Sequence, residues 1–288
     1  VLCWGDNQYG QLGNGSNTSS NLPVEVVGIS GATNIVAGGN HTCVLVGDSI
    51  WCWGRNDKGQ VGDGSTVDAN KPVEVLGGAG NLTAGLDYTC GILKDGRVMC
   101  WGNNEHGQLG DGTRTSHALP YLARLITGVS GLDAGDEKTC GLNPAGLITC
   151  WSDAAGQSLG GAPEGTADVA VNRFGNQVVG VDEQGVPLTY QSGQFKLVSA
   201  LSDVLDIDAG VAHVCALLKA GGVDCWGGNE YGQLGDDSTK TSADPVLVKG
   251  LAGASDLAVG RNHACVIAGG NPQKLNVQCW GLNTDGQL

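Results

Sequence analysis

The sequence predicts an all-β fold, a seven-bladed β-propeller that is incomplete at both ends, with four short antiparallel strands in each blade. One type of segment recurs through the chain at intervals of mostly about 50 residues. Within each copy, runs rich in β-branched and aromatic residues are bounded by Gly, Asn and Asp. No long segment shows the 3.6-residue period of an amphipathic helix. A β-solenoid is the alternative, but solenoid repeats are usually shorter.

The most regular motif begins with Cys-Trp-Gly and ends in a Gly-rich turn. It reads CWGDNQYGQLGNG from Cys3, with further copies from Cys52, Cys100 and Cys225, a shortened copy from Cys279 and a weaker one from Cys150. A second motif, of the type AGxxHTC, precedes all of these but the first, and ends at Cys43, Cys90, Cys140, Cys215 and Cys265. A third, LPVEVVG from Leu22, returns as KPVEVLG from Lys71.

One further copy is hidden in the long interval between Trp151 and Trp226. It contains the segment VVGVDEQGVPLTYQSG, which aligns with the other copies when Gly185 is taken as the turn glycine. The alignment places Val179 and Thr189 at the two cysteine positions and Tyr190 at the tryptophan position. This copy brings the predicted number to seven.

We expect a single propeller domain over residues 1–288. Its copies span approximately residues 1–28, 29–77, 78–126, 127–167, 168–200, 201–250 and 251–288, of which the first and the last are partial. Seven complete copies would need roughly 350 residues. The expectation is therefore a fragment of a longer reading frame, although a ring that closes with fewer blades is the alternative.

The combined pattern AGxxHTC…DGxVxCWGxNxxGQLGDGT resembles the repeat of the regulator-of-chromosome-condensation family of seven-bladed β-propellers, over essentially the whole chain. The cysteines resemble those of a bacterial extracellular branch of that family rather than the eukaryotic nuclear one. The resemblance implies a propeller that acts as an exchange factor, an enzyme inhibitor or an interaction platform.

Ten of the eleven cysteines fall into pairs within a copy. Around the three-residue turn Lys94–Gly96, counting outwards along the hairpin places Cys90 opposite Cys100, where a disulfide needs only modest adjustment. The same counting pairs Cys43 with Cys52, Cys140 with Cys150, Cys215 with Cys225, and Cys265 with Cys279. The first of these pairs has a shorter turn, at Gly47–Asp48, and the last has a longer loop.

The copy that lacks these cysteines lacks both, at Val179 and Thr189, which favours bonded pairs over independent buried thiols or a zinc site. Cys3 is left without a partner in the chain, and we expect that truncation explains it. Disulfides indicate an extracellular, cell-surface or periplasmic protein.

Net charge and composition exclude several classes of partner. The formal charge of −14, without a Lys/Arg-rich run, disfavours nucleic-acid binding. No apolar run reaches the ~18 residues of a membrane helix, so we expect no membrane insertion within this segment. We expect an unidentified protein partner and a monomer at full length.

Three histidines occupy one equivalent position of the repeat, two residues before a cysteine: His41, His213 and His263. Tyr88 and Lys138 hold this position in other copies. A catalytic or metal-binding residue would not be exchanged so freely, and the prediction is a structural role beside the inner strands. The tryptophans that follow the cysteines are expected to pack in the core or between blades.

The turns that begin at Gly13, Gly62, Gly110 and Gly235 read GNG, GDG or GDD. Asp and Asn favour such turns, and calcium binding is the weaker alternative because no loop clusters several carboxylates. The chain has no phosphate loop, no HExxH zinc motif and no GxSxG elbow. The sequence therefore predicts no catalytic residue, no metal ligand and no cofactor.

Two neighbouring copies depart from the consensus, between residues 152 and 200. The GQLG loop is missing from one of them, and the other is eroded. A partner-binding surface at Arg173, Phe174, Tyr190 and Phe195 is one interpretation, and simple degeneration of the repeat is the other.

The function predicted from these observations is a non-catalytic, extracellular protein-interaction module. The first alternative, implied by the nuclear relatives, is guanine-nucleotide exchange on a small GTPase. It needs a cytosolic or nuclear protein, which the predicted disulfides disfavour. The second alternative is an enzyme that uses the central channel of the propeller.

Overall fold

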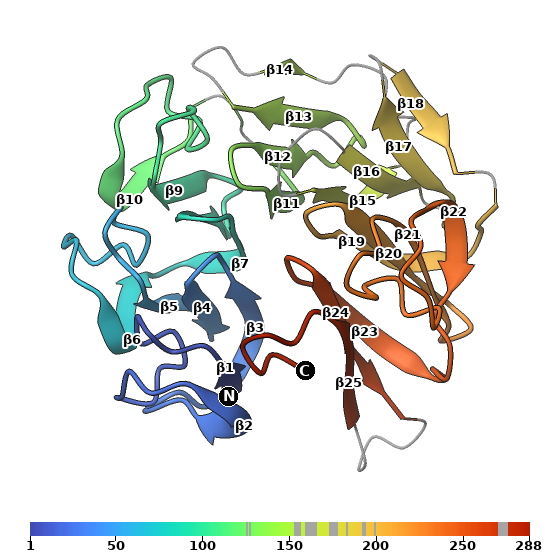
Figure 1. Ribbon diagram of the computed structural model, residues 1–288. Helices are drawn as coiled ribbons and strands as arrows, with labels where there is room; N and C mark the ends of the chain where they lie inside the picture. Colours follow the sequence, from blue (N-terminus) through green and yellow to red (C-terminus); the bar gives the residue numbers. More distant parts are fainter. Residues whose placement is uncertain are drawn as a thin grey trace. The chain divides into compact units, whose positions relative to one another are not determined.

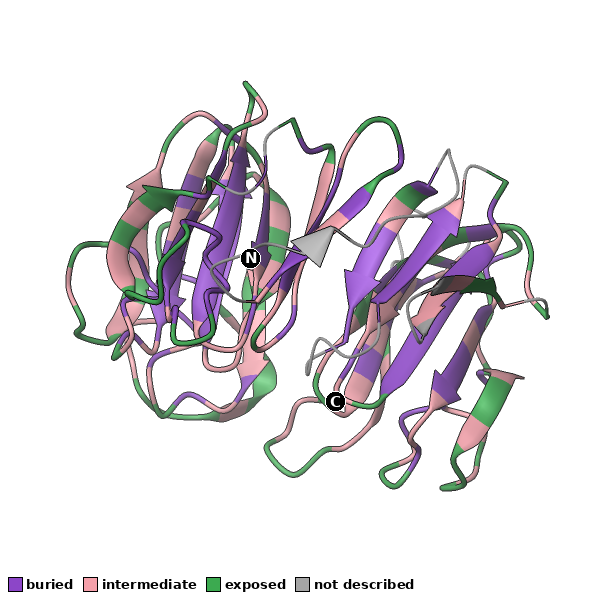
Figure 2. Ribbon diagram, turned by 90° about the horizontal axis from the view of Figure 1, so that it is seen from above, coloured by how far each residue is buried: buried purple, intermediate pink, exposed green. Residues whose placement is uncertain are grey.

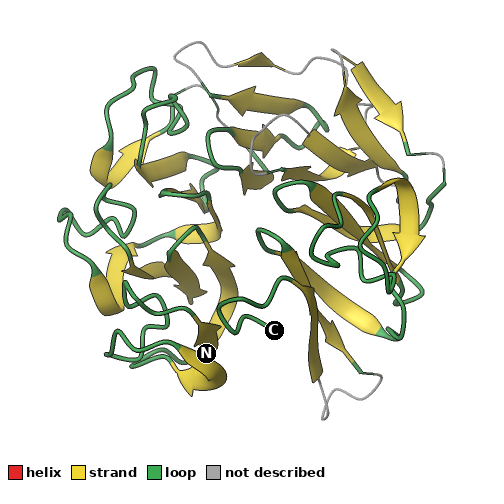
Figure 3. Cartoon of the chain, in the orientation of Figure 1, coloured by secondary structure: helices red, strands yellow, loops and turns green. Residues whose placement is uncertain are grey.

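Short hairpins dominate the structure because turn residues interrupt the chain before any strand exceeds eight residues. The computed structural model describes residues 1–288 except 125, 127, 153–156, 159–165, 173–177, 183, 192–193, 199 and 270–275. The described residues form strands, turns and loops without a helix, which confirms the all-β prediction (Figure 3). Accordingly, the described part of the chain offers no long apolar helix that could cross a membrane.

The chain divides into two compact units. The first comprises Val1–Pro144, Ile148–Gly160 and Asp285–Gln287, and the second comprises Ala145–Leu147, Gly161–Thr284 and Leu288. Each unit is built from antiparallel sheets whose strands follow one another in the sequence (Figure 1).

The first unit holds four sheets. Their strands are β1 (Leu2–Gly5) and β2 (Ser20–Glu25); β3 (Ala32–Ala37), β4 (His41–Val46), β5 (Ser49–Gly54) and β6 (Ala69–Leu76); β7 (Ala79–Ala84), β8 (Tyr88–Leu93), β9 (Val98–Gly102) and β10 (His117–Leu122); and β11 (Gly131–Ala134), β12 (Thr139–Leu142), β13 (Ile148–Trp151) and β14 (Gln157–Ser158). Successive sheets pack through their first strands, with β3 and β4 against β7, and β7 against β11.

The second unit holds three sheets. Their strands are β15 (Thr166–Val171), β16 (Val178–Asp182), β17 (Pro187–Gln191) and β18 (Gln194–Leu197); β19 (Val204–Ala209), β20 (His213–Leu218), β21 (Val223–Gly227) and β22 (Ser242–Leu247); and β23 (Ala254–Val259), β24 (His263–Ala268) and β25 (Asn276–Gly281). Here β15 packs against β19, and β19 packs against β23.

The prediction of seven blades was wrong. Among the described residues, six sheets have the three or four strands of a propeller blade, and the remaining sheet is the β1–β2 pair alone. The reason is that the first copy supplies only the strands that correspond to the third and fourth of a blade. Five of the six blades have all four strands, whereas β23, β24 and β25 form a blade of three.

The strand registers follow the turn lengths. Cys90 lies opposite Cys100 and Ile92 opposite Val98, as the three-residue turn predicts. In the divergent copy, Val179 lies opposite Thr189, which confirms the alignment on Gly185. The structure brings all five predicted cysteine pairs to disulfide distance, with their Cα atoms 4.0–4.1 Å apart.

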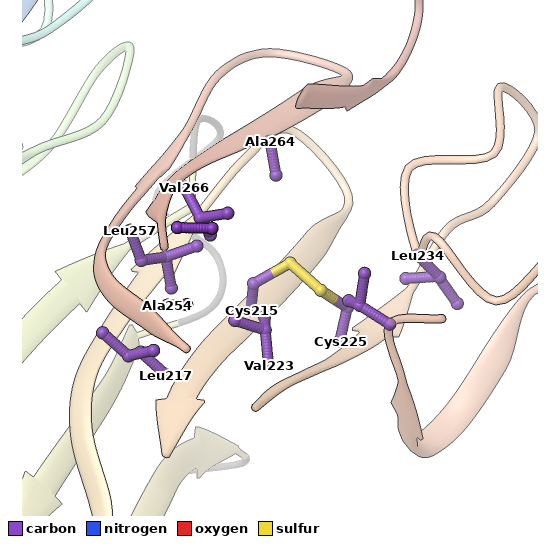
Figure 4. Packing of buried hydrophobic residues seen from close by; sticks show 11 residues of the cluster. Cys215, Leu217, Val223, Cys225, Leu234, Ala254, Leu257, Ala264 and Val266 are labelled. Carbon is purple, nitrogen blue, oxygen red and sulfur yellow. A yellow bond between two sulfur atoms is a disulfide. The ribbon is translucent and has the colours of Figure 1, made fainter. Parts of the chain in front are cut away.

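The second and third strands of the blades carry most of the buried side chains, and Figure 2 shows the buried residues, in purple, mainly on strands. In β20 and β21, the disulfide between Cys215 and Cys225 is fully buried among aliphatic side chains of its own and the following sheet. Figure 4 shows this cluster, in which Val223 and Leu257 lie on neighbouring sheets. Burial of such side chains between sheets is the main term that stabilises each pair of blades.

The AGxxH segments need glycine because the neighbouring atoms leave no space for a Cβ atom at this position. A Cβ atom on Gly38 would overlap the imidazole of His41 and the main-chain oxygen of Gly85 in the next blade. The same overlap arises at Gly85 with Tyr88, at Gly210 with His213, and at Gly260 with His263. The Gly and the ring three residues later therefore form one packing unit, repeated from blade to blade.

Candidate functional site

The loops that follow the Cys-Trp-Gly motif are each held by a buried asparagine. The side-chain oxygen of Asn56 accepts a hydrogen bond from the Val61 amide at 2.9 Å, and its amide nitrogen donates to the main-chain oxygens of Ser65 and Val67. Asn7, Asn104 and Asn229 form the same network in their own loops. All four side chains are fully buried, so the bonds compensate for their loss of water.

The glutamine of the GQLG motif fixes the tip of each loop. The side-chain oxygen of Gln60 accepts a hydrogen bond from the amide of Lys58 at 2.8 Å. Four further pairs repeat this contact, with Tyr9 and Gln11, His106 and Gln108, Tyr231 and Gln233, and Asp285 and Gln287. The residue whose amide is held in this way is Tyr, Lys, His or Asp, whereas the glutamine side chain that holds it is constant.

The Asp of the Gly-Asp turns is part of the same scaffold. The Asp111 carboxylate accepts hydrogen bonds from the Asn104 side chain and the Thr113 amide. His117 lies 2.8 Å from this carboxylate. Burial raises the pKa of Asp111, but the hydrogen bonds from His117, Thr113 and Asn104 outweigh this effect, and the pKa lies below its ordinary value. This carboxylate therefore serves the turn itself.

Each loop is also clamped by the tryptophan of the following copy. The indole Nε1 of Trp101 donates to the main-chain oxygen of Gln60 at 3.0 Å, and that of Trp151 donates to Gln108 at 2.8 Å. In the second unit, Trp280 donates to Gln233 at 2.9 Å. The predicted structural role of these tryptophans is thus confirmed, and it includes a polar contact as well as packing.

The loop tips of the first unit are connected by charged contacts. Lys58 Nζ lies 2.7 Å from Glu105 Oε1, and the hydrogen bond raises the pKa of the lysine and lowers that of the glutamate. The guanidinium of Arg55 lies over the ring of Tyr9, 5.2 Å from its centroid. His106 Nε2 lies 3.4 Å from Glu137 Oε1. Each of these three contacts joins side chains of two successive copies of the repeat.

We call Tyr9, Arg55, Lys58, Glu105, His106 and Glu137 the loop-tip surface of the first unit. Sequence reasoning missed it as a site, although a signal was present. The two residues before the GQLG glycine vary from copy to copy, as Gln-Tyr, Asp-Lys, Glu-His and Glu-Tyr, within an otherwise constant motif. Variable side chains on a rigid, repeated loop are suited to contacts with another molecule.

The histidine of the repeat is a buried structural group in the blade formed by β3 to β6. His41 Nε2 lies 2.9 Å from Thr89 Oγ1 in the next blade. Burial lowers the pKa of His41 to about 4, and that of His213 also to about 4. Tyr88 stands at the same position, and its hydroxyl donates to the main-chain oxygen of Lys138 at 2.9 Å. The ring therefore links adjacent blades.

Two of the four residues predicted for partner binding, Arg173 and Phe174, lie outside the described residues. The other two, Tyr190 on β17 and Phe195 on β18, face each other across the strands. Their ring centroids are 5.0 Å apart, and both side chains are half-buried. The structure thus brings this pair together.

Cys3 lies on β1, at the position that Cys52 and Cys100 hold in complete blades, and it is free. Burial raises the pKa of its thiol to about 11, an effect that the N-terminal ammonium group partly opposes. In the part of the chain that the structure describes, no three His, Cys, Asp or Glu side chains are grouped so that they could hold a metal ion.

Comparison with known proteins gives the family. The model of the "Regulator of chromosome condensation (RCC1) repeat" matches residues 1–45, 48–91, 95–142 and 220–267, and a second model with the same description matches residues 32–60, 81–108 and 204–233. Among curated proteins, the probable E3 ubiquitin-protein ligase HERC4 of Homo sapiens is 36% identical over 96 residues. That match covers 32% of this chain and only 9% of the length of the ligase.

Solved structures show the same fold. Yeast RCC1 (Prp20), solved bound to Kap60, superposes with a TM-score of 0.84 at 16% identity, over 99% of this chain and 79% of that chain. A further structure of Prp20p from Saccharomyces cerevisiae superposes with a TM-score of 0.83 at 17% identity, over 99% of this chain and 81% of that chain. The family models match well over half of the residues, and the chain belongs to the RCC1 repeat family of β-propellers.

Proposed function

We propose that this chain is a non-catalytic protein-interaction module that binds its partner through the loop-tip surface. One observation carries the proposal: three loops of the first unit share one buried scaffold, yet each presents a different pair of side chains at its tip. A rigid loop loses little conformational entropy when it binds, so a varied tip on a fixed base favours specific contacts.

The chemistry of the tips suits a protein partner of mixed charge. Tyr and Arg are enriched at the centres of protein interfaces, and Tyr9 and Arg55 are of these types. The Prp20p structure is described together with its binding properties to Gsp1p and histones, which shows that a propeller of this fold binds proteins. In our proposal the partner of the present chain is likewise a protein.

We further propose that the chain works outside the cytosol. Its five cysteine pairs are consistent with an oxidising compartment, where disulfides form and persist. The extracellular, cell-surface or periplasmic setting, and the bacterial branch whose cysteines the sequence resembles, belong to this proposal.

A photo-crosslinking experiment tests the surface. Benzoylphenylalanine is placed at tip positions Tyr9, Lys58 and His106, one at a time, and at position Phe195 for the aromatic pair. Leu119 and Leu247, exposed on fourth strands, are the control positions. Each variant is incubated with the native medium of the source organism, and crosslinked bands are identified by mass spectrometry.

The expected result is one partner protein captured at the tip positions and absent at the two control positions. Capture at Phe195 alone would instead place the binding surface at the aromatic pair of Tyr190 and Phe195. A partner crosslinked only at Leu119 and Leu247, or none at any position, would contradict the loop-tip proposal.

A further inference from the structure

The first strands of five blades carry a polar residue at one equivalent position. The register of β3, β7, β15, β19 and β23 shifts near the start of each strand, and the residue directly after the shift is Asn or Asp. In the first unit this residue is Asn34 or Asn81. In the second unit it is Asp168, Asp206 or Asp256. The two units therefore differ in the charge of one repeated position.

The side chains at this position share one orientation. In each case Oδ1 accepts a hydrogen bond from the main-chain amide of the following residue, at 2.8 Å in Asn81, 2.8 Å in Asp168 and 3.1 Å in Asp256. One side-chain oxygen thus serves the residue's own strand. The second polar atom of the side chain is left for a contact with a neighbouring blade.

In the first unit, this second atom joins two blades through an amide. Asn34 Nδ2 on β3 donates a hydrogen bond to Asn81 Oδ1 on β7 at 2.9 Å. An amide nitrogen always carries the protons that such a bond needs. The contact between these two first strands is therefore independent of pH.

In the second unit, the corresponding contact joins two carboxyl groups. β15 packs against β19, and the side chains of Asp168 and Asp206 are hydrogen-bonded to each other. Ionised carboxylates only accept hydrogen bonds, so this contact exists only while one of the two groups holds a proton. Asp168 stands at the donor position of Asn34, and Asp206 stands at the acceptor position of Asn81.

We propose that Asp168 and Asp206 share one proton, which locks the first strands β15 and β19 together in mild acid. When the pH rises and the proton leaves, two carboxylates face each other and the contact weakens. The second unit thus carries a pH-sensitive lock at a position where the first unit has a permanent hydrogen bond. The lock is separate from the loop-tip surface and does not depend on the function proposed for it.

The surroundings of the pair favour the protonated state. Burial raises the pKa of Asp206 above its ordinary value of 3.8, and the negative charge of Asp256 on β23 raises it further. Hydrogen bonds from the Ile207 amide and from Asp168 oppose this effect without outweighing it. The folded chain therefore binds the proton more tightly than the unfolded chain. The contribution to stability is complete below pH 3.8 and is lost as the pH rises through the raised pKa.

The strands packed against the pair supply no permanent positive charge. Neither Lys nor Arg occurs on β15, β16, β19, β20, β23 or β24. The other ionisable groups on these strands are Asp182, Asp208, His213 and His263. Main-chain amides donate to both of these carboxylates, and burial lowers the pKa of both histidines. The proton is thus the group that neutralises the pair.

Hydrogen exchange of the complete chain tests the lock. Asp168→Asn supplies the permanent donor that Asn34 provides in the first unit. Protection factors of the amides in β15 and β19 are compared between this variant and the parent chain, so that the pH dependence of the histidines cancels. The variant is expected to be protected about tenfold more strongly at about pH 7.5, and within about twofold of the parent at about pH 4.5.

The control is Asp244→Asn, the same exchange at an exposed position on β22 of the same unit. It is expected to match the parent chain within about twofold at both pH values. An amide that acted only through better packing would raise protection equally at both pH values. Such a constant ratio for Asp168→Asn would overturn the proposal.

Carbon-13 NMR of the Asp206 carboxyl group gives a second readout. In the parent chain this group is expected to titrate above pH 3.8. Asp256→Asn removes the neighbouring charge and is expected to move the titration to lower pH, while Asp168→Asn is expected to move it further, because the permanent donor favours the carboxylate. Titration of Asp206 at or below pH 3.8 in the parent chain would contradict the shared proton.

Discussion

The indole Nε1 of Trp53 donates a hydrogen bond of 2.8 Å to the main-chain oxygen of Gln11, a residue of the preceding copy. The indole also lies directly against Gly13, where a Cβ atom would overlap it. In the first unit, the same bond joins Trp4 to the main-chain oxygen of Gln287 at 3.2 Å. The tryptophan of the repeat is thus both a core residue and the clamp of a loop.

Replacing this clamp is expected to destabilise the protein. Trp53→Phe removes the donor and leaves a cavity, and we expect a loss of about 2–4 kcal/mol in the free energy of unfolding, measured by urea denaturation. Trp51→Phe is the matched control, because Trp51 lies outside the repeated motif and is only half-buried. An equal effect of the two substitutions would show that the indole bond contributes nothing of its own.

The buried asparagine of the loop makes a second prediction. Asn56→Ala leaves several main-chain groups of the loop without partners and is expected to cost about 2–4 kcal/mol. Hydrogen exchange is expected to accelerate locally, from residue 56 to residue 68. Asn103→Ala, which alters an exposed contact, is the control and is expected to change stability by less than about 1 kcal/mol. Undiminished protection of the loop in Asn56→Ala would refute its role.

Buried histidine makes stability depend on pH. The pKa of His41 is about 4 in the folded chain, against an ordinary value of 6.5, because burial disfavours the charged ring. Between these values the unfolded state binds more protons than the folded state. The contribution of His41 is therefore complete above pH 6.5 and is lost as the pH falls toward about 4, by up to about 3 kcal/mol.

His41→Tyr tests this dependence, since Tyr88 already fills the equivalent position in the next blade. We expect the variant to lose less stability than the parent chain between pH 6.5 and 4, in urea titrations at several pH values. His106→Tyr, the same exchange of residue type at an exposed loop position, is the control. Parallel curves for the parent chain and His41→Tyr would rule the mechanism out.

The thiol of Cys3 is expected to react slowly. With its pKa raised to about 11, the thiolate fraction at pH 8 is on the order of 0.1%. Labelling with iodoacetamide should therefore be much slower in the folded chain than after denaturation. Mass spectrometry should count one labelled thiol in the denatured, unreduced chain, and eleven after reduction. More than one thiol before reduction would contradict the five disulfide pairs.

Much of the fold was predictable because the hairpins are local. The register of Cys90 with Cys100 follows from the length of one turn, and turn length is set by residues such as Asp95 and Gly96. The register of Val179 with Thr189 followed from the same rule, even where the cysteines are replaced. The repeat presents the same pattern of turns and strands several times. The strands of an ambiguous copy can therefore be assigned by comparison with the other copies.

The candidate site was less predictable. Sequence reasoning looked for function where copies diverge as a whole, at Tyr190 and Phe195, and passed over variation inside the regular loops. The loop-tip surface emerges only when Lys58 and Glu105, which belong to different copies, are seen to meet at 2.7 Å. Such contacts depend on how successive sheets pack, and no spacing along the chain encodes that distance.

The sequence by itself determined the strands, their registers and the pairing of cysteines, since each depends on a few neighbouring residues and on turn geometry. Only the tertiary structure decided the number of blades and the clamp of each loop by the next tryptophan. These features depend on which segments meet across sheets. Local propensities do not encode which segments of different sheets come into contact.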